Sequence, residues 1–196
     1  MTTVESEEAT RGGWIQTYTG RVFFPLDPRV ADIEPIDIIW ALSHANRFLG
    51  HTKRPYSVAE HCCRVHDLVT AKAPRQLHTR LAALLHDGEE AYLCDLPTPI
   101  KRSVVGYAEA ETRVSAVIFE AFDIRPGLVD WSAIRYADLT LLATEKRYLM
   151  APTPRSWIAL PQPLDLPWWD RMGWSPQRAR WAFKRRLRAL IYRMYE

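Results

Sequence analysis

Two histidines and two aspartates stand where apolar helix faces are expected. His86 and Asp87 continue an apolar run, Asp138 falls on the apolar stripe of residues 132–150, and His61 shares one side of its segment with two valines. A buried, unpaired ion costs several kcal/mol, so polar groups placed there need a partner. Imidazole and carboxylate together suit a divalent transition metal such as Co, Mn, Zn, Fe or Ni. The four residues therefore predict a site for one such cation.

The segments that must position these side chains are mostly helical. Apolar residues recur at helical spacing, with start and stop signals at the ends of each run. The predicted helices cover residues 32–49, 57–71, 76–93, 107–122, 132–150 and the last 20 residues. Residues 15–24 predict a short β-hairpin around a Thr19-Gly20 turn. The expected fold class is all-α with a short N-terminal β-hairpin.

Local signals fix several helix ends. The S-x-x-E spacing of Ser57 and Glu60 predicts a capping box, in which each side chain binds an amide of the other residue. Ser132 is expected to cap the helix of residues 132–150. Pro97 and Pro99 cannot continue the helix before them, so a loop is expected there.

Composition favours one soluble globular domain. The 196 residues are 47% hydrophobic and 25% charged. We expect a single domain over residues 14–196 and a mobile tail over residues 1–13, which lack the apolar stretch of a secretory signal. No apolar run approaches the roughly 18 residues of a membrane span. Three cysteines without C-x-x-C spacing fit a reducing compartment, so we expect a cytoplasmic protein without a membrane partner.

The last 20 residues combine seven basic side chains with apolar residues at helical spacing. The favoured interpretation is an amphipathic helix that docks its aromatic stripe, including Trp181 and Phe183, and leaves its basic face in solvent. Nucleic acid is not the favoured partner of this helix.

The stretch between Ala151 and Pro176 is rich in proline and tryptophan, which predicts a long irregular segment. Its tryptophans are Trp157, Trp168, Trp169 and Trp174. They offer more aromatic surface than a small monomer covers, so a homo-oligomer, a dimer or larger, is expected.

The order of the candidate ligands resembles a known family. The H…HD…D pattern resembles the signature of HD-domain metal-dependent phosphohydrolases. The strings H-D-G-E-E at residues 86–90 and D-L-P-T-P-I-K at residues 95–101 are similar to those of small deoxyribonucleoside 5′-monophosphatases and of phage dATP triphosphohydrolases. The resemblance runs from about Arg47 to Arg147.

The resemblance implies an HD-domain helical bundle in which one divalent metal is bound by His61, His86, Asp87 and Asp138. It also implies two catalytic acids, Glu90 and Asp95, and two phosphate-binding cations, Arg47 and Lys101. A metal activates water and polarises a phosphoryl oxygen. A nearby carboxylate relays a proton, and arginine and lysine offset phosphate charge.

Recognition of base and sugar is less defined. Phe48 and Trp40 are candidates to stack on a base, and Asn46 is a candidate to read its edge. Core packing is the competing interpretation of both aromatic residues. We favour one essential metal, with a second ion, brought as Mg with the substrate, as the alternative.

The expected function is a metal-dependent phosphohydrolase that releases the 5′-phosphate of deoxynucleoside monophosphates. The nearest alternative uses the same centre to release triphosphate from dNTPs such as dATP, with Lys53, Arg54 and Arg102 lengthening a phosphate channel. An alternative from another class is a nucleic-acid- or partner-binding protein with a structural metal. A cyclic-nucleotide or (p)ppGpp phosphodiesterase ranks third among the enzymes.

Overall fold

A computed structural model describes residues 10–157, 159–167, 170 and 172–196. These residues are mostly helical, with a two-stranded antiparallel hairpin near the N-terminus, which confirms the expected class at this level. The strands are β1 (Ile15–Gln16) and β2 (Val22–Phe23). The helices are α2 (Pro35–His44), α3 (Val58–Lys72), α4 (Leu77–Leu85), α5 (Glu90–Leu93), α6 (Thr98–Lys101), α7 (Tyr107–Ala121), α8 (Trp131–Leu149) and α9 (Pro176–Met194). Short 3-10 turns are η1 (Val30–Asp32), η2 (Arg47–Gly50) and η3 (Pro126–Leu128).

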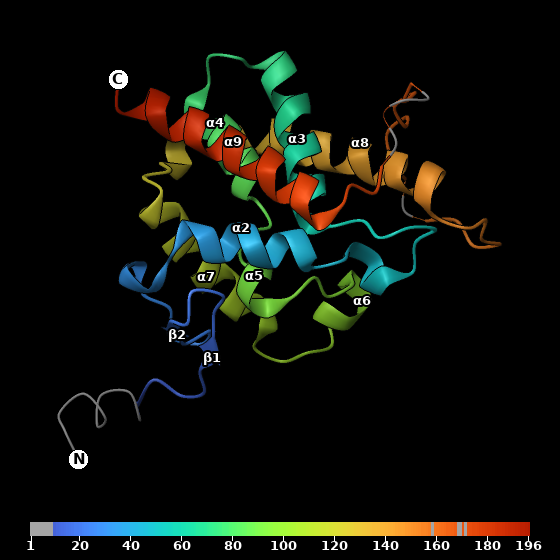
Figure 1. The fold of residues 1–196 in the computed structure, drawn as a ribbon. Helices are drawn as coiled ribbons and strands as arrows, with labels where there is room; N and C mark the ends of the chain where they lie inside the picture. The colour runs from blue at the N-terminus through green and yellow to red at the C-terminus, as the bar shows by residue number, and fades with distance from the viewer. Residues whose placement is uncertain (1–9, 158, 168–169, 171) are drawn as a thin grey trace.

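Helix α3 lies at the centre of the helix packing. It contacts α4, α8 and α9, while α2 packs against α9, α3 and α5. Figure 1 shows α3, α4, α8 and α9 gathered above α2, with the hairpin below it. This packing brings the first turn of α3, the end of α4 and the middle of α8 together, and these are the elements that carry the predicted ligands.

The N-terminal hairpin is anchored on the helices. Phe23 of β2 is buried and stacks on Tyr92 of α5 at 3.9 Å between ring centroids. The turn is held by the Asp37 carboxylate of α2, which accepts hydrogen bonds from the Thr19 amide and hydroxyl at 2.7 and 2.9 Å. The short strands are therefore fixed by side chains of α2 and α5.

Arg11, which was expected to belong to a mobile tail, is held against the folded chain. Its guanidinium binds the carboxylates of Asp27 and Asp32 at 2.8 and 2.6 Å and lies over the Phe24 ring. Residues 1–9 of the expected tail lie outside the described residues. The anchored chain therefore begins before residue 14.

The predicted single helix over residues 76–93 is wrong. Helix α4 ends at Leu85 and α5 begins at Glu90, with a turn between them in which the Gly88 amide binds the Leu85 carbonyl at 2.9 Å. A Cβ at position 88 would lie 2.9 Å from that carbonyl oxygen, so the turn needs glycine. His86 and Asp87 therefore lie at the end of α4 and in the turn after it, not in the middle of a longer helix.

Two caps differ from the prediction. The Glu60 amide donates to Ser57 Oγ at 3.2 Å, as expected, but the reciprocal half of the capping box is absent, because the Glu60 carboxylate is turned toward the chain beyond α8. Helix α8 begins one residue earlier than predicted, so Asp130 caps it rather than Ser132. The Ser132 hydroxyl instead donates to the Asp130 carboxylate at 2.6 Å.

The predicted helix over residues 32–49 is also shorter than expected. Helix α2 ends at His44, and Phe48 and Leu49 adopt left-handed φ angles of 57° and 52°. The chain therefore leaves the helix before the stretch that carries Arg47.

The C-terminal helix forms, but one expectation about it is wrong. Phe183, Leu187 and Leu190 are buried, whereas Trp181 is 63% exposed and does not dock. In the described residues between α8 and α9 the chain is irregular, as predicted. Trp168 and Trp169 of that segment lie outside the described residues. Among the described helices, none has the length and apolarity needed to cross a bilayer.

Candidate metal centre

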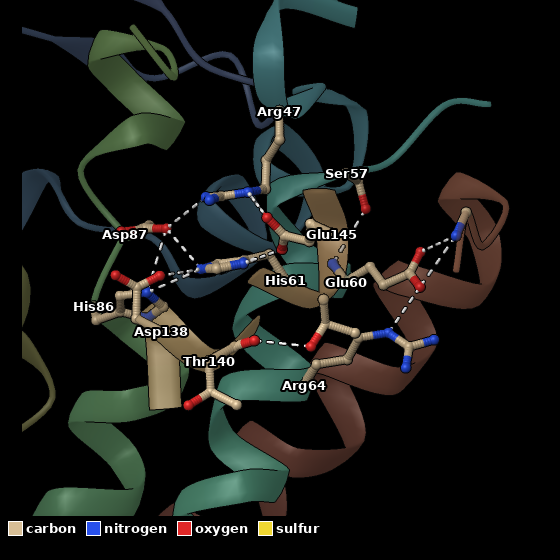
Figure 2. A network of polar contacts seen from close by, with 12 residues as sticks. Arg47, Ser57, Glu60, His61, Arg64, His86, Asp87, Asp138, Thr140 and Glu145 are labelled. Atoms are coloured by element: carbon tan, nitrogen blue, oxygen red, sulfur yellow. Dashed lines mark hydrogen bonds and ion pairs between the residues drawn. The ribbon is translucent and has the colours of Figure 1, made fainter. Parts of the chain in front are cut away.

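The predicted ligands meet in one cluster (Figure 2). His61 comes from the first turn of α3, His86 and Asp87 from the end of α4 and the turn after it, and Asp138 from α8. Nε2 of His61 lies 3.3 Å from Nε2 of His86, 3.5 Å from Oδ2 of Asp87 and 3.2 Å from Oδ1 of Asp138. Nε2 of His86 lies 3.4 Å from Oδ2 of Asp87. Three helical elements thus direct nitrogen and oxygen atoms toward one point.

Both imidazoles have their outer nitrogen engaged. Nδ1 of His61 donates to Oε1 of Glu145 at 2.6 Å, and Nδ1 of His86 donates to the carbonyl of Ala83 at 2.9 Å. A neutral imidazole carries one N–H, so both Nε2 atoms present lone pairs. In the neutral rings two lone pairs face each other across 3.3 Å beside a carboxylate, an arrangement that positive charge between them stabilises, whether a proton on His61 or a metal ion.

The raised pKa of His61 also shows that the cluster favours a positive charge at this position. Burial and the Arg47 charge lower this pKa, but Glu145 and Asp138 outweigh them and raise it to about 10. Burial alone would raise the pKa of Asp138, yet the hydrogen bond and charge of His61 lower it. The cluster therefore favours ionised carboxylates around a cationic centre.

The spacing of the donor atoms fits a metal ion. Ligand atoms bound at about 2.0–2.2 Å to one ion lie roughly 3.0–3.5 Å apart at neighbouring coordination positions. The distances given above fall between 3.2 and 3.5 Å. The ligand atoms of His61, His86 and Asp87 all lie within 4.8 Å of one another, so this group can hold a metal. Asp138 lies outside that group and joins it through its contact with His61.

Glu145 is a site residue that the sequence reasoning missed. It is fully buried on α8, binds His61 through Oε1 and lies 3.4 Å from Nε of Arg47 through Oε2. Arg47 and His61 offset the burial and lower the pKa of its carboxyl. The sequence does contain a pattern that points to Glu145. It follows Asp138 by seven residues, or two helical turns, and so lies on the same face of the helix.

Arg47 lies at the cluster, as expected. Its NH1 atom is 3.3 Å from Oδ2 of Asp87, and its backbone amide donates to the carbonyl of Tyr56 at 2.9 Å. Burial lowers the pKa of Arg47, but Glu145, Asp87 and other nearby carboxylates raise it well above its ordinary value. The guanidinium is therefore a permanent positive charge beside the candidate metal position.

Glu90, Asp95 and Lys101 form an adjacent acid–base group. The Glu90 side chain is buried, and its Oε1 lies 3.6 Å from Nζ of Lys101, which also binds Glu111 at 2.5 Å. Burial, followed by the charges of Asp87 and Asp95, raises the pKa of Glu90 well above its ordinary value. Oε2 of Glu90 has no hydrogen-bond partner among the described residues. Burial and the neighbouring carboxylates therefore favour the protonated form of Glu90 more than in an ordinary glutamate.

Of the three candidate base contacts, Phe48 and Asn46 lie near the cluster and Trp40 does not. Phe48 lies beside the cluster, with the Arg47 guanidinium 5.5 Å from its ring centre and the Trp157 ring 6.2 Å away. Asn46 is exposed next to Arg47, at a β-bridge to Ser57.

Trp40 is wrong as a base contact. Tyr18 stacks on its ring at 3.8 Å and the guanidinium of Arg180 lies 3.9 Å from its centre, so its stacking surface is occupied. The contacts of Trp40 are with the hairpin and α9, because α2 ends before the chain reaches the cluster.

The three cations expected to lengthen a phosphate channel do not lie together. Arg54 donates to the carbonyl of Met172 at 3.5 Å, Arg102 is exposed at the end of α6, and Lys53 lines a separate cavity. Within the described part of the chain, the His61 group is the single cluster with metal-ligand spacing.

Comparisons with known proteins give the family of the chain. No family model matches it. The chain is 38% identical over 115 residues to "Uncharacterized protein RCAP_rcc00048" of Rhodobacter capsulatus, a match that covers 57% of this chain and 59% of that protein. It is 37% identical over 147 residues to "Uncharacterized protein YfdR" of Escherichia coli K12, covering 75% of this chain and 78% of the relative. The chain therefore belongs to the same family as YfdR.

Proposed function

We propose that the chain is a metal-dependent phosphohydrolase that releases the 5′-phosphate of deoxynucleoside monophosphates. The opposed Nε2 atoms of His61 and His86, 3.3 Å apart with both Nδ1 atoms engaged, carry the metal part of this proposal. The phosphohydrolase part is supported by the neighbouring Arg47 and Lys101 and by the resemblance of the ligand pattern to HD-domain enzymes.

The centre has features that a structural metal does not need. His61 is fully buried, whereas the Asp138 side chain is 36% exposed, so the cluster opens toward solvent on one side. Three ligands and a flanking aspartate leave coordination positions for water and substrate, which is typical of catalytic rather than structural sites. Glu90 is not a predicted ligand, yet it lies close enough for the charge of Asp87 to raise its pKa, and Lys101 lies 3.6 Å from Glu90.

The side chains have separable tasks in the proposed reaction. A bound divalent metal supplies a polarised phosphoryl oxygen and a more acidic water. Arg47 has N–H groups that are not directed at Asp87 or Glu145. These groups can donate two hydrogen bonds to one phosphate. Lys101 adds a second positive charge.

Glu90 is the proton carrier in this proposal. Its buried carboxyl, with a raised pKa, can exchange a proton with the attacking water or the departing nucleoside oxygen. Asp95 contributes to that raised pKa through its charge. Phe48, whose ring lies 5.5 Å from the Arg47 guanidinium, and Trp157, whose ring lies 6.2 Å from that of Phe48, are our candidates for base stacking.

The triphosphohydrolase alternative has less support. It needs a row of cations leading from the centre, but Lys53, Arg54 and Arg102 point to different parts of the molecule. The homo-oligomer that we expect from the tryptophan-rich segment stays a prediction, which light scattering coupled to gel filtration tests.

A product-resolved assay tests the function. Metal-reconstituted protein is incubated with the four dNMPs and the four dNTPs, and phosphate, pyrophosphate and triphosphate are separated. We expect inorganic phosphate from dNMPs with wild type and with the control His78→Ala, and none with His86→Ala. Triphosphate from dNTPs with dNMPs untouched would establish the alternative instead. No product from any substrate, with steeply salt-dependent nucleic-acid binding, would favour a binding protein.

A further inference from the structure

A cavity of about 600 Å³ lies between the last turns of α8 and residues 150–156, 160, 161 and 163 of the segment that follows it. Four cationic side chains line it, namely Lys53, Lys146, Arg147 and Arg155, and none of its described lining residues is acidic. The hydroxyl residues Thr153 and Ser156 complete the polar part of the wall.

Most of this positive charge is uncompensated. Arg147 binds Asp165 at 2.8 Å, but that carboxylate is 87% exposed and lies outside the lining. Lys53, Lys146 and Arg155 have no carboxylate within ion-pair distance among the described residues, and Nζ of Lys146 lies 5.2 Å from the Trp157 ring centre. Cations brought together without a counter-charge repel one another, so a bound polyanion would stabilise this arrangement.

Helix stabilisation explains only part of the charge. Lys146 and Arg147 lie in the last turn of α8, where cations interact favourably with the helix dipole. Lys53 precedes α3 and Arg155 follows α8, so neither serves that purpose, and the fold brings both to the same cavity.

We propose that this cavity is a binding site for a polyphosphate, either the triphosphate of a nucleoside triphosphate or an inorganic chain. Its volume is within the range of small-molecule sites. Several separated cations match a chain of phosphates better than one phosphate group, because each phosphate carries its own charge.

The cavity is separate from the candidate centre, and two aromatic rings lie between Lys146 and Arg47. Trp157, which Lys146 touches, lies 6.2 Å from Phe48, and the Phe48 ring lies 5.5 Å from the Arg47 guanidinium. Glu145 of the centre directly precedes Lys146 on α8. Binding at the cavity does not require hydrolysis at the centre, so the two proposals succeed or fail independently.

Calorimetry of the full chain in chelator and low salt, with inorganic triphosphate and ATP as probes, tests the site. We expect the double variant Lys146→Ala/Arg155→Ala to bind triphosphate about tenfold more weakly or worse. The matched variant Lys184→Ala/Arg188→Ala, which removes two exposed cations of α9, should stay within about twofold of wild type. Circular dichroism verifies that each variant is folded.

The outcomes separate the possibilities. Equal weakening in both double variants would mean non-specific attraction and overturn the proposal. Unchanged binding in Lys146→Ala/Arg155→Ala would place the anion elsewhere, and no binding by wild type at millimolar triphosphate would also overturn the proposal. If the site holds, tighter binding of ATP than of inorganic triphosphate identifies a nucleotide ligand, and equal binding identifies the phosphate chain as the determinant.

Discussion

Nδ1 of His61 lies 2.6 Å from Oε1 of Glu145, and both side chains are fully buried. This contact fixes the imidazole so that its Nε2 lone pair faces His86 and Asp87. A carboxylate behind a ligating histidine sets the ring orientation and strengthens the nitrogen as a ligand. The pair therefore connects the core of α8 with the candidate metal position.

Replacing Glu145 by Gln should weaken metal binding. The amide keeps the shape but removes the charge that supports His61 and Arg47, so we expect the affinity for a divalent metal to fall about 10- to 100-fold. Competition with a chelating dye measures this affinity. The matched variant Glu120→Gln, on the exposed face of α7, should bind as wild type does. Unchanged affinity in Glu145→Gln would remove Glu145 from the centre.

Removing the metal should lower thermal stability. A ligand at about 100 times its dissociation constant stabilises the folded state by about 2.7 kcal/mol, which corresponds to roughly 5–10 °C for a chain of this size. We expect excess chelator to lower the melting temperature of wild type by this amount in differential scanning fluorimetry. His86→Ala should melt at the same temperature with and without metal. An equal response of the two proteins would contradict binding at His86.

Glu90→Gln should stabilise the metal-free protein at alkaline pH. The folded state raises the pKa of Glu90, so this carboxyl contributes full stability below its ordinary pKa and loses it as the pH rises toward the raised value. The neutral amide avoids that loss. We expect a melting temperature about 3 °C above wild type near pH 8 and a smaller difference near pH 5. A gain that does not change with pH would show that ionisation of Glu90 is not its cause.

Much of the centre was predictable, because a charge on an apolar helix face is visible in sequence. His61, His86 and Asp87 were found in this way, and Asp138 lies against His61 as expected. Glu145 lies two turns after Asp138 on the same face of α8, but its burial against His61 and Arg47 does not follow from that spacing. A helical spacing shows which face a residue occupies but not which neighbour that face meets.

The errors have local causes. The helix over residues 76–93 breaks because Gly88 permits a tight turn that the apolar pattern does not reveal. Trp40 was assigned to the site on the assumption that its helix continues to Arg47, whereas α2 ends at His44. Glu60 has the capping-box spacing, but its carboxylate accepts hydrogen bonds from the amides of Gly173 and Trp174 at 3.0 and 2.6 Å. Contacts between residues more than a hundred positions apart leave no such local pattern.

Gly173→Ala should destabilise the fold more than Gly50→Ala. Both glycines have positive φ angles, of 93° and 78°, so both variants introduce backbone strain. Only at position 173 would a Cβ meet neighbours, 2.5 Å from Arg54 Cδ and 3.0 Å from the carbonyl of Pro55. We expect the free energy of unfolding to fall about 1 kcal/mol further in Gly173→Ala, measured by urea denaturation. Equal losses would show that the close approach of residue 173 to Arg54 and Pro55 adds nothing at this position.

Phosphate release from dAMP by wild type and Glu90→Gln, each loaded with the same metal to the same stoichiometry, tests the central claim most directly. Glu90 is not needed to bind the ion, so the two proteins should differ only in proton transfer. We predict that wild type releases inorganic phosphate and that Glu90→Gln is slower by about 100- to 10,000-fold. Equal rates in the two proteins, or no release by metal-loaded wild type from dAMP or any other dNMP, would contradict the account.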